Sequence, residues 1–160
     1  MLSRADEPIM KDNSAEETHS KRRIIAAAKD LFHQQGVRAS QVDEIVEASG
    51  VSRREFNRSF RSKQKLAKEV VLAYLADIKS GRSCLHRILA SWSDFERSLA
   101  RHVTFLNQFK MLRGCPLAVI WNELTEKHDA IRQVLSLVFE ALTKRMTAFF
   151  RKQKTEGHLS

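Results

Sequence analysis

Two glycine-containing breaks divide the segment from Ile24 to Leu66 into three short helices and the start of a fourth. Gly36 follows the first apolar helical pattern, and Gly50-Val51-Ser52 separates the second pattern from the third. Glycine readily adopts the left-handed conformation that ends a helix, so we expect sharp turns at both places. With only five Gly and two Pro in 160 residues, the chain has few turn signals for a many-stranded sheet. The sequence therefore predicts an all-α protein that begins with a compact three-helix unit.

The third helix of this unit, together with the turn after it, is strongly basic. From Ser52 to Lys68 the chain has seven basic residues and a single acidic one, Glu55, and the whole chain has a formal net charge of +9. An excess of positive charge favours a polyanionic partner, and nucleic acid is the commonest one. A solvated basic surface is the alternative interpretation. The position of these residues directly after a Gly-containing turn favours contact with DNA.

Two short helices joined by a Gly-containing turn are the pattern of a helix-turn-helix, here at about residues 40–59. In this motif the first helix crosses the phosphate backbone, and the second presents its N-terminal residues to base edges in the major groove. We expect Ser40 and Ser52 to be the two N-caps. Glu55, three residues after Ser52, completes a predicted capping box.

The rest of the chain is predicted to be helical after a polar start. Residues 1–17 lack apolar periodicity and are expected to form a disordered arm, residues 18–66 the helix-turn-helix domain, and residues 67–160 a helical regulatory and dimerisation domain. The apolar series after residue 84 fits either one helix or two with a bend near residues 91–94. Apolar residues at helical spacing predict helices over about residues 18–35, 41–49, 63–78, 85–106, 116–127 and 129–156.

Several classes of function are excluded by what the sequence lacks. No apolar run approaches the roughly 18 residues of a membrane span, and the start of the chain has no signal-peptide core, so we expect a cytoplasmic protein. Cys84 and Cys115 have no metal-ligand partners at matching spacing, and we interpret them as buried structural thiols. No nucleophile elbow, phosphate-binding loop or zinc-protease pattern is found. We therefore expect no enzymatic activity, no metal and no cofactor.

These helices resemble the N-terminal domain of the tetracycline-repressor (TetR) family over about residues 20–66. A segment near Gly114-Cys115-Pro116-Leu117 also resembles a recurring part of the family's regulatory half. The resemblance implies a homodimeric transcription factor, usually a repressor, that binds a palindromic operator in double-stranded DNA and is released by a small hydrophobic effector. The residues that carry the resemblance in the N-terminal domain are Ile24 to Phe32, Gly36, Val42 to Ile45, Gly50 to Ser52, Phe60 and Ser62-Lys63.

The resemblance also implies which residues contact DNA. Arg54 stands where the family favours a small residue, and Asn57 stands where a Tyr is frequent, so we expect an altered site preference. Glu55 either caps its helix, which we favour, or accepts a hydrogen bond from cytosine. The implied contacts lie at the start of the second helix, along the third and at the start of the fourth: Ser40, Gln41, Ser52, Arg53, Arg54, Asn57, Arg58 and Lys63.

An effector of this kind needs a largely apolar pocket. Ordinary core packing is the alternative interpretation of the aromatic residues that could form one. Family members usually carry one more long helix beyond the equivalent of Gly157, so dimerisation is expected to rest largely on residues 129–156. A second hypothesis is therefore an interaction protein that heterodimerises with a full-length regulator and modulates it. The candidate pocket residues are Trp92, Phe95, His102, Phe105, Phe109 and Trp121.

Overall fold

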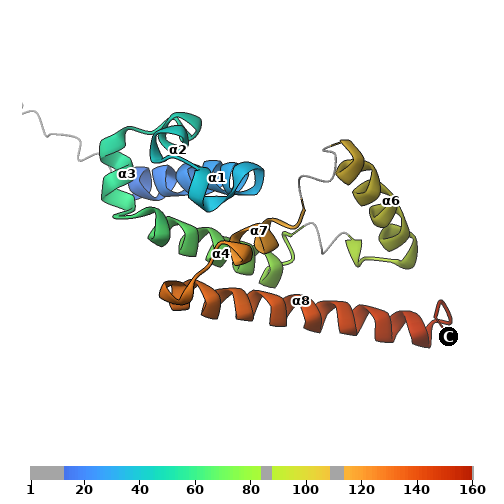
Figure 1. Cartoon of the computed structure of the whole chain (residues 1–160). Helices are drawn as coiled ribbons and strands as arrows, with labels where there is room; N and C mark the ends of the chain where they lie inside the picture. The colour runs from blue at the N-terminus through green and yellow to red at the C-terminus, as the bar shows by residue number, and fades with distance from the viewer. Residues whose placement is uncertain (1–12, 84–87, 109–113, 160) are drawn as a thin grey trace, which may run out of the picture.

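The computed structural model describes residues 13–83, 88–108 and 114–159, and every regular element in these ranges is a helix (Figure 1). The predicted all-α class is confirmed. None of the described helices combines the length and apolar character needed to cross a membrane. The elements are α1 (Asn13–Ala39), α2 (Val42–Ser49), α3 (Arg53–Ser59), α4 (Lys63–Lys79), α6 (Trp92–Gln108), α7 (Pro116–Asn122), the 3-10 helix η1 (Glu126–His128) and α8 (Asp129–Thr155).

The first helix is longer than predicted and is broken near its end. It begins at Asn13 rather than Thr18, so the last residues of the expected disordered arm are helical. Gly36 interrupts it with φ 85° and ψ 167°, a conformation that side-chain-bearing residues rarely adopt. The predicted break at Gly36 is confirmed, and one further turn leads to Ala39.

Helices α1, α2 and α3 form a small head around a shared apolar centre. Gly50 ends α2 in the left-handed conformation, with φ 60° and ψ 28°, which turns the chain into α3. The ring centroids of Phe56 and Phe60 are 6.0 Å apart, and both side chains are buried, as their spacing predicts. The head is centred on the buried side chains of Ile24, Ala28, Phe32, Ile45, Phe56 and Phe60.

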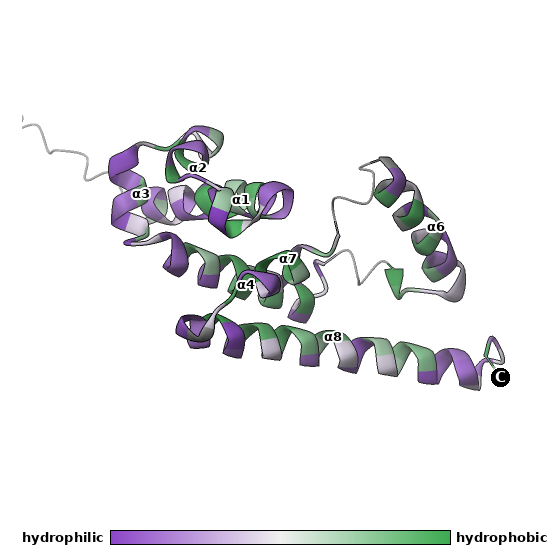
Figure 2. Ribbon diagram, in the orientation of Figure 1, coloured by the Kyte–Doolittle hydropathy of each residue, from purple (hydrophilic) through white to green (hydrophobic). Residues whose placement is uncertain are grey.

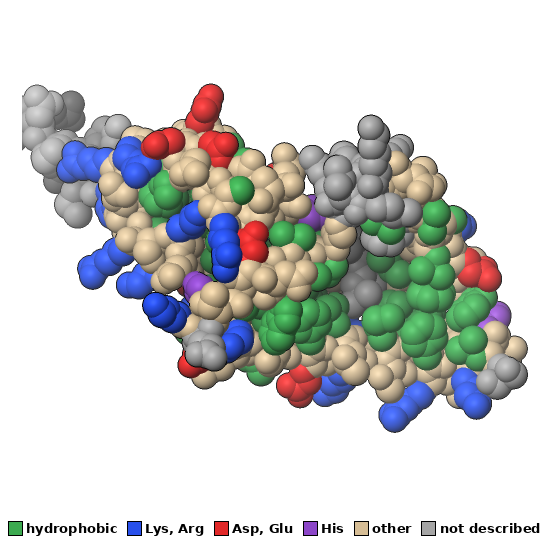
Figure 3. Space-filling view, viewed as in Figure 1, with side chains coloured by type: hydrophobic (Ala, Val, Ile, Leu, Met, Phe, Trp, Pro, Cys, Tyr) green, Lys and Arg blue, Asp and Glu red, His purple; other side chains and the backbone are tan. Residues whose placement is uncertain are grey.

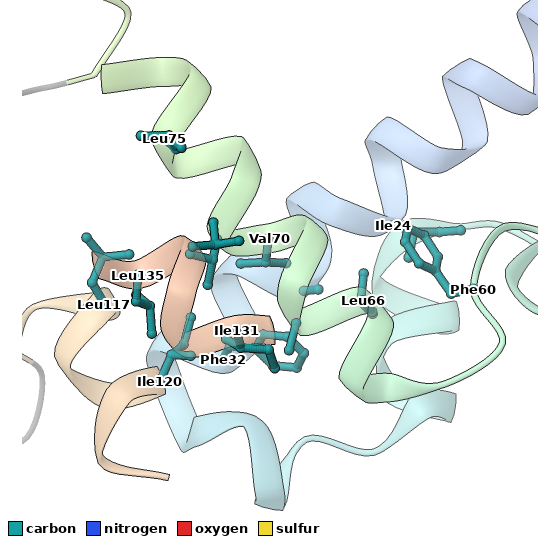
Figure 4. Close-up of a cluster of buried hydrophobic side chains, with 14 of the residues drawn as sticks. Ile24, Phe32, Phe60, Leu66, Val70, Leu75, Leu117, Ile120, Ile131 and Leu135 are labelled. Atoms are coloured by element: carbon teal, nitrogen blue, oxygen red, sulfur yellow. The ribbon is translucent and has the colours of Figure 1, made fainter. Parts of the chain in front are cut away.

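Helix α4 joins the head to the second half of the chain through one continuous core. Leu66 and Val70 on α4 are fully buried between the head and helices α7 and α8 (Figure 4). Ile120 from α7 and Leu135 from α8 complete the same cluster. Burying a side chain of this size contributes about 1.5–3 kcal/mol. Figure 2 shows the contrast between these apolar faces and the hydrophilic α3.

The second half of the chain decides one open alternative and differs from the prediction in one place. Of the two interpretations of the series after residue 84, the structure has the one with a break near residues 91–94, because α6 starts at Trp92 and Ser91 Oγ accepts the Asp94 N–H at 3.1 Å. Helix α7 ends at Asn122 rather than near Lys127. The chain then turns, and the imidazole of His128 accepts the Thr125 N–H at 3.0 Å. This local bond stabilises a short 3-10 turn in place of further α-helix.

Helix α6 lies beside the C-terminal half of α8, away from the head (Figure 1). Phe95 on α6 packs against Phe149 and Phe150 on α8, with ring centroids 5.6 and 5.4 Å apart. Gly157, with φ 82°, follows the end of α8 as predicted. The aromatic contacts are what hold α6 against the C-terminal part of α8.

Candidate nucleic-acid interface

The start of α3 is fixed by a reciprocal capping box. Ser52 Oγ accepts the Glu55 N–H at 3.2 Å, and Glu55 Oε2 accepts the Ser52 N–H at 2.8 Å and the Ser52 hydroxyl at 2.6 Å. Ser20 donates a further bond to Glu55 Oε1 at 2.9 Å. The bonds from Ser52 are the main reason that the pKa of Glu55 falls to about 2. The predicted capping role of Glu55 is confirmed, and this carboxylate is already occupied within the protein.

The capping box and the two phenylalanines decide which face of α3 meets solvent. Because Phe56 and Phe60 point into the head, the side chains of Arg54, Asn57 and Arg58 are exposed on the opposite side. Residues three and four apart share one face of a helix, so these three form one polar, basic surface. Lys and Arg side chains gather at this end of the molecule (Figure 3).

Two of the exposed arginines have carboxylate partners. Arg53 forms a short ion pair with Asp43 in the first turn of α2. Arg58 Nε lies 3.7 Å from Glu17 Oε1 on α1, an exposed pair of the kind that contributes little stability. Within the described ranges, Arg54 makes no ion pair or hydrogen bond. Its guanidinium is thus the one on this helix that is free to bind an outside acceptor.

The predicted contacts at the start of α2 need one correction. Ser40 is fully buried and its hydroxyl donates to the Gly36 carbonyl at 2.6 Å, so it neither caps α2 nor offers its hydroxyl to a phosphate. The N-cap is Gln41, one residue later, whose N–H donates to Glu44 Oε2 at 2.7 Å. The side chain of Gln41 is exposed. The Gly36 carbonyl also accepts the Ser40 N–H at 3.3 Å, so the hydroxyl and the amide of Ser40 are both held at the end of α1.

Lys63, at the first position of α4, is bound within the protein. Its ammonium donates to the carbonyls of Arg38 and Ser40 at 2.9 and 3.0 Å. These carbonyls belong to the segment that leads from α1 into α2. An ammonium has three N–H donors, so one remains for an anion. Lys63 therefore links the entrance of the helix-turn-helix to the start of α4.

A contact between the head and α7 lies next to Lys63 and is absent from the predicted site. Glu123 Oε2 accepts the Arg38 N–H at 2.7 Å, and Arg38 Nη2 reaches the Glu123 carbonyl at 3.4 Å. A Cβ atom added at Gly36 would lie 2.0 Å from Glu123 Oε1. Glycine is therefore required here both for its backbone conformation and for the close approach of this carboxylate. No local sequence pattern indicates a pairing across so many residues.

A cleft opens beside this contact, between the head and the second half of the chain. Its volume is about 270 Å³. The apolar part of its wall includes Val37, Ile120 and Ile131, and the polar part includes Arg38, Lys63, Gln64, Glu123 and His128. The cleft is formed by different residues from those of the predicted effector pocket.

The predicted pocket residues fall into two groups. Trp92 and Phe95 pack together with ring centroids 5.5 Å apart, and Trp92 also stacks on His158 beyond the end of α8 at 5.9 Å. Trp121 instead packs edge-on against Phe139, with centroids 6.0 Å apart, and is largely exposed. The side chains of His102 and Phe105, and all of Phe109, lie outside the described residues.

The expectation of buried thiols is also corrected. Cys115 is exposed at the N-cap of α7 and is a free cysteine. Cys84 lies outside the described ranges.

This arrangement is that of a helix-turn-helix protein with a helical second half. Residues 24–70 match the family described as bacterial regulatory proteins, tetR family. The N-terminal domain therefore belongs to the TetR family, and the chain is a DNA-binding transcriptional regulator.

Two solved structures have a similar fold. The crystal structure of regulatory protein TetR from Rhodobacter sphaeroides is 23% identical, with a TM-score of 0.71 over 88% of this chain and 76% of that one. The crystal structure of E. coli NemR in its reduced form is 18% identical, with a TM-score of 0.63 over 88% and 74% of the two chains. No curated protein matches the chain significantly. At these identities the likeness shows a shared fold, including the helical second half.

Proposed function

We propose that this protein is a dimeric repressor that binds a palindromic DNA operator and leaves it when a small hydrophobic effector binds. The observation that carries the DNA-binding half of this proposal is the exposed face of α3, where Arg54 is unpaired among the described residues and lies beside Asn57 and Arg58. An arginine guanidinium can bind guanine through two hydrogen bonds in the major groove. Ser52, Arg53, Gln41 and Lys63 would flank these base contacts with contacts to the phosphate backbone.

Dimerisation is proposed to use the outer face of α8. Phe139 and Met146 are each 38% exposed, and their spacing of seven residues places them on the same side of the helix. Next to them, an open groove of about 550 Å³ is lined by Met146, Phe150 and Leu159, among others. Exposed apolar side chains that lie close together are typical of an interaction surface. A second copy of the chain would cover them in a two-fold, self-complementary interface.

The effector is proposed to bind near the aromatic side chains between α6 and α8. Trp92 and Phe95 supply apolar surface there, opposite Phe149 and Phe150. A hydrophobic ligand between the two helices would change how α6 packs on α8. We place the protein in the cytoplasm, where a regulator of this type has access to its operator.

The test is an in vitro selection of random double-stranded DNA on the purified 160-residue chain near physiological salt. A dimeric repressor should enrich a palindrome whose half-sites are about one helical turn, or a multiple of it, apart. Binding without an enriched motif would reject the specific homodimer. That result would favour the alternative function, in which the chain forms a heterodimer with a full-length regulator. The alternative also predicts that the isolated chain sediments as a monomer.

A further inference from the structure

We propose that the cleft between the head and the regulatory half binds a small carboxylate with an apolar body, and that this ligand competes with DNA for Lys63. The proposal deepens the proposed function, because it adds a second regulatory site to the same DNA-binding protein. The cleft lies between the end of α1, the start of α4, the end of α7, η1 and the start of α8. It is separate from the aromatic cluster between α6 and α8.

The polar wall of the cleft offers more hydrogen-bond donors than acceptors. Lys63 and Arg38 are both cationic, and the ammonium of Lys63 has one N–H left beyond its two carbonyl partners. Both nitrogens of His128 already have partners, since Nδ1 accepts the Thr125 N–H at 3.0 Å and Nε2 lies 3.3 Å from the side-chain nitrogen of Gln64, so the donors left for a ligand are those of Lys63, Arg38 and Gln64. The Glu123 carboxylate is the opposing anion, and its Oε2 already accepts the Arg38 N–H. An anionic ligand would satisfy this excess of donors.

The rest of the wall is apolar and limits the size of the ligand. Val37, Ala67, Ile120, Leu124 and Ile131 line it. At about 270 Å³ the cleft lies just below the roughly 300–1,000 Å³ of pockets for drug-sized ligands. A carboxylate on a single ring or a short alkyl chain fits this combination of an apolar wall and a cationic rim. Benzoate is a suitable probe.

The position of Lys63 connects the cleft to DNA binding. The same ammonium is a proposed phosphate contact on the outside and a part of the cleft wall on the inside. It also holds the carbonyls of Arg38 and Ser40, from which α2 begins. A carboxylate bound to Lys63 would use the donor that a DNA phosphate needs. Linkage makes this competition reciprocal: the ligand weakens DNA binding by the same factor by which DNA weakens ligand binding.

The first experiment titrates benzoate into the isotope-labelled, DNA-free full chain and follows amide chemical shifts. We expect a dissociation constant on the order of 1 mM, as suits a ligand with few atoms, with shifts concentrated at Gln64, Leu124 and His128. Benzylamine, which has the same ring and the opposite charge, should not bind. Absence of benzoate binding, or equal binding of benzylamine, would overturn the proposed carboxylate site.

Two variants and one control test the role of the cleft wall. Lys63→Met keeps most of the side-chain length, removes the charge and should weaken benzoate binding at least tenfold. Gln64→Trp narrows the cleft from an exposed position, leaves the core intact and should also weaken binding. Lys65→Met removes an exposed charge two residues along α4, where the side chain points elsewhere, and should bind benzoate like the wild type. Unchanged binding to both Lys63→Met and Gln64→Trp would reject the cleft as the site.

The link to DNA is measured separately on the operator that the selection yields. Saturating benzoate should weaken operator binding by the wild type severalfold and leave the residual binding of Lys63→Met unchanged. If benzoate binds but operator affinity stays constant, the competition for Lys63 is rejected. If the wild type recognises no operator, the proposed repressor function fails, while the benzoate titration still decides whether the site exists.

Discussion

At the scale of single residues, α3 separates side chains that hold the helix from side chains that can bind DNA. Ser52 and Glu55 are bonded to each other, and Arg53 is paired with Asp43. Arg54 has no such partner within the described ranges. A side chain that is free before binding loses no intramolecular bond when it binds a base. Arg54 is therefore the residue to which we assign most of the sequence preference.

Replacing Arg54 tests this assignment. Arg54→Ala should reduce discrimination by about 1–3 kcal/mol at one base pair per half-site, measured by competition between the operator and single-base variants. Arg54→Lys is the matched control: it keeps the charge but loses the planar fork that binds guanine through two bonds. It should therefore retain affinity for DNA in general while losing the same discrimination. A uniform loss on all sequences in Arg54→Ala would instead identify a phosphate contact.

The capping box predicts a specific dependence of stability on pH. The pKa of Glu55 falls from its ordinary 4.5 to about 2 in the folded protein. A carboxyl whose pKa is lowered by folding contributes stability that is complete above pH 4.5 and is lost as the pH falls toward 2. Glu55→Gln should therefore flatten the dependence of unfolding free energy on pH in this window, as measured by urea denaturation. If the unfolding free energies of the wild type and Glu55→Gln changed with pH in parallel, Glu55 would not be the cause of this pH dependence.

At the scale of elements, the contact between α1 and α7 ties the head to the second half of the chain. The break at Gly36 leaves the Arg38 N–H without a helical partner, and Glu123 supplies one. His33 adds a second link, with Nε2 at 2.8 Å from the Gly114 carbonyl. Both contacts join α1, which precedes α4 in the sequence, to the two ends of α7, which follows α4. Movement of α7 would thus be transmitted to the residues from which α2 begins.

Removal of the Glu123 carboxylate should loosen this junction. Glu123→Ala leaves the Arg38 N–H unpaired and should lower the unfolding free energy by about 1 kcal/mol. Hydrogen exchange should also become faster at the Arg38 amide. Glu123→Gln is the matched control, since its amide oxygen can accept the same bond. If Glu123→Gln were as destabilised as Glu123→Ala, the charge rather than the hydrogen bond would carry the contact.

At the scale of the whole molecule, the face of α8 that exposes Phe139 and Met146 is proposed to pack against a second copy of the chain. Met146→Glu places a charge in the centre of the proposed interface, and we expect the variant to sediment as a monomer where the wild type is a dimer. Its operator affinity should fall at least tenfold, because two linked heads bind more tightly than one. Leu99→Glu, at an exposed position on α6, is the control and should remain dimeric. A monomeric wild type, or a dimeric Met146→Glu, would contradict the interface.

The parts of this structure that could be predicted are those set by local chemistry. The spacing of Phe56 and Phe60, the capping box and the breaks at Gly36 and Gly50 follow from neighbouring residues. The burial of Ser40 could not be predicted, because it depends on how the chain packs between the break at Gly36 and the N-cap at Gln41, where the Ser40 hydroxyl binds the Gly36 carbonyl. The cleft is formed by residues from five elements, and its carboxylate, Glu123, reaches a helix far away in the sequence. Such a site can be recognised only once the tertiary packing of these elements is known.

The continuous core also limits how this protein can be taken apart or recombined. Buried residues run from Ile24 in the head through Leu66 and Val70 on α4 to Leu135 on α8. A chimera that grafts only residues 13–62 onto another regulator would leave α1 without the surfaces of α4 and α7 against which it packs. The transferable module is therefore the head together with α4 and its matching faces on α7 and α8. Engineers who wish to change the operator should redesign the exposed face of α3 in place.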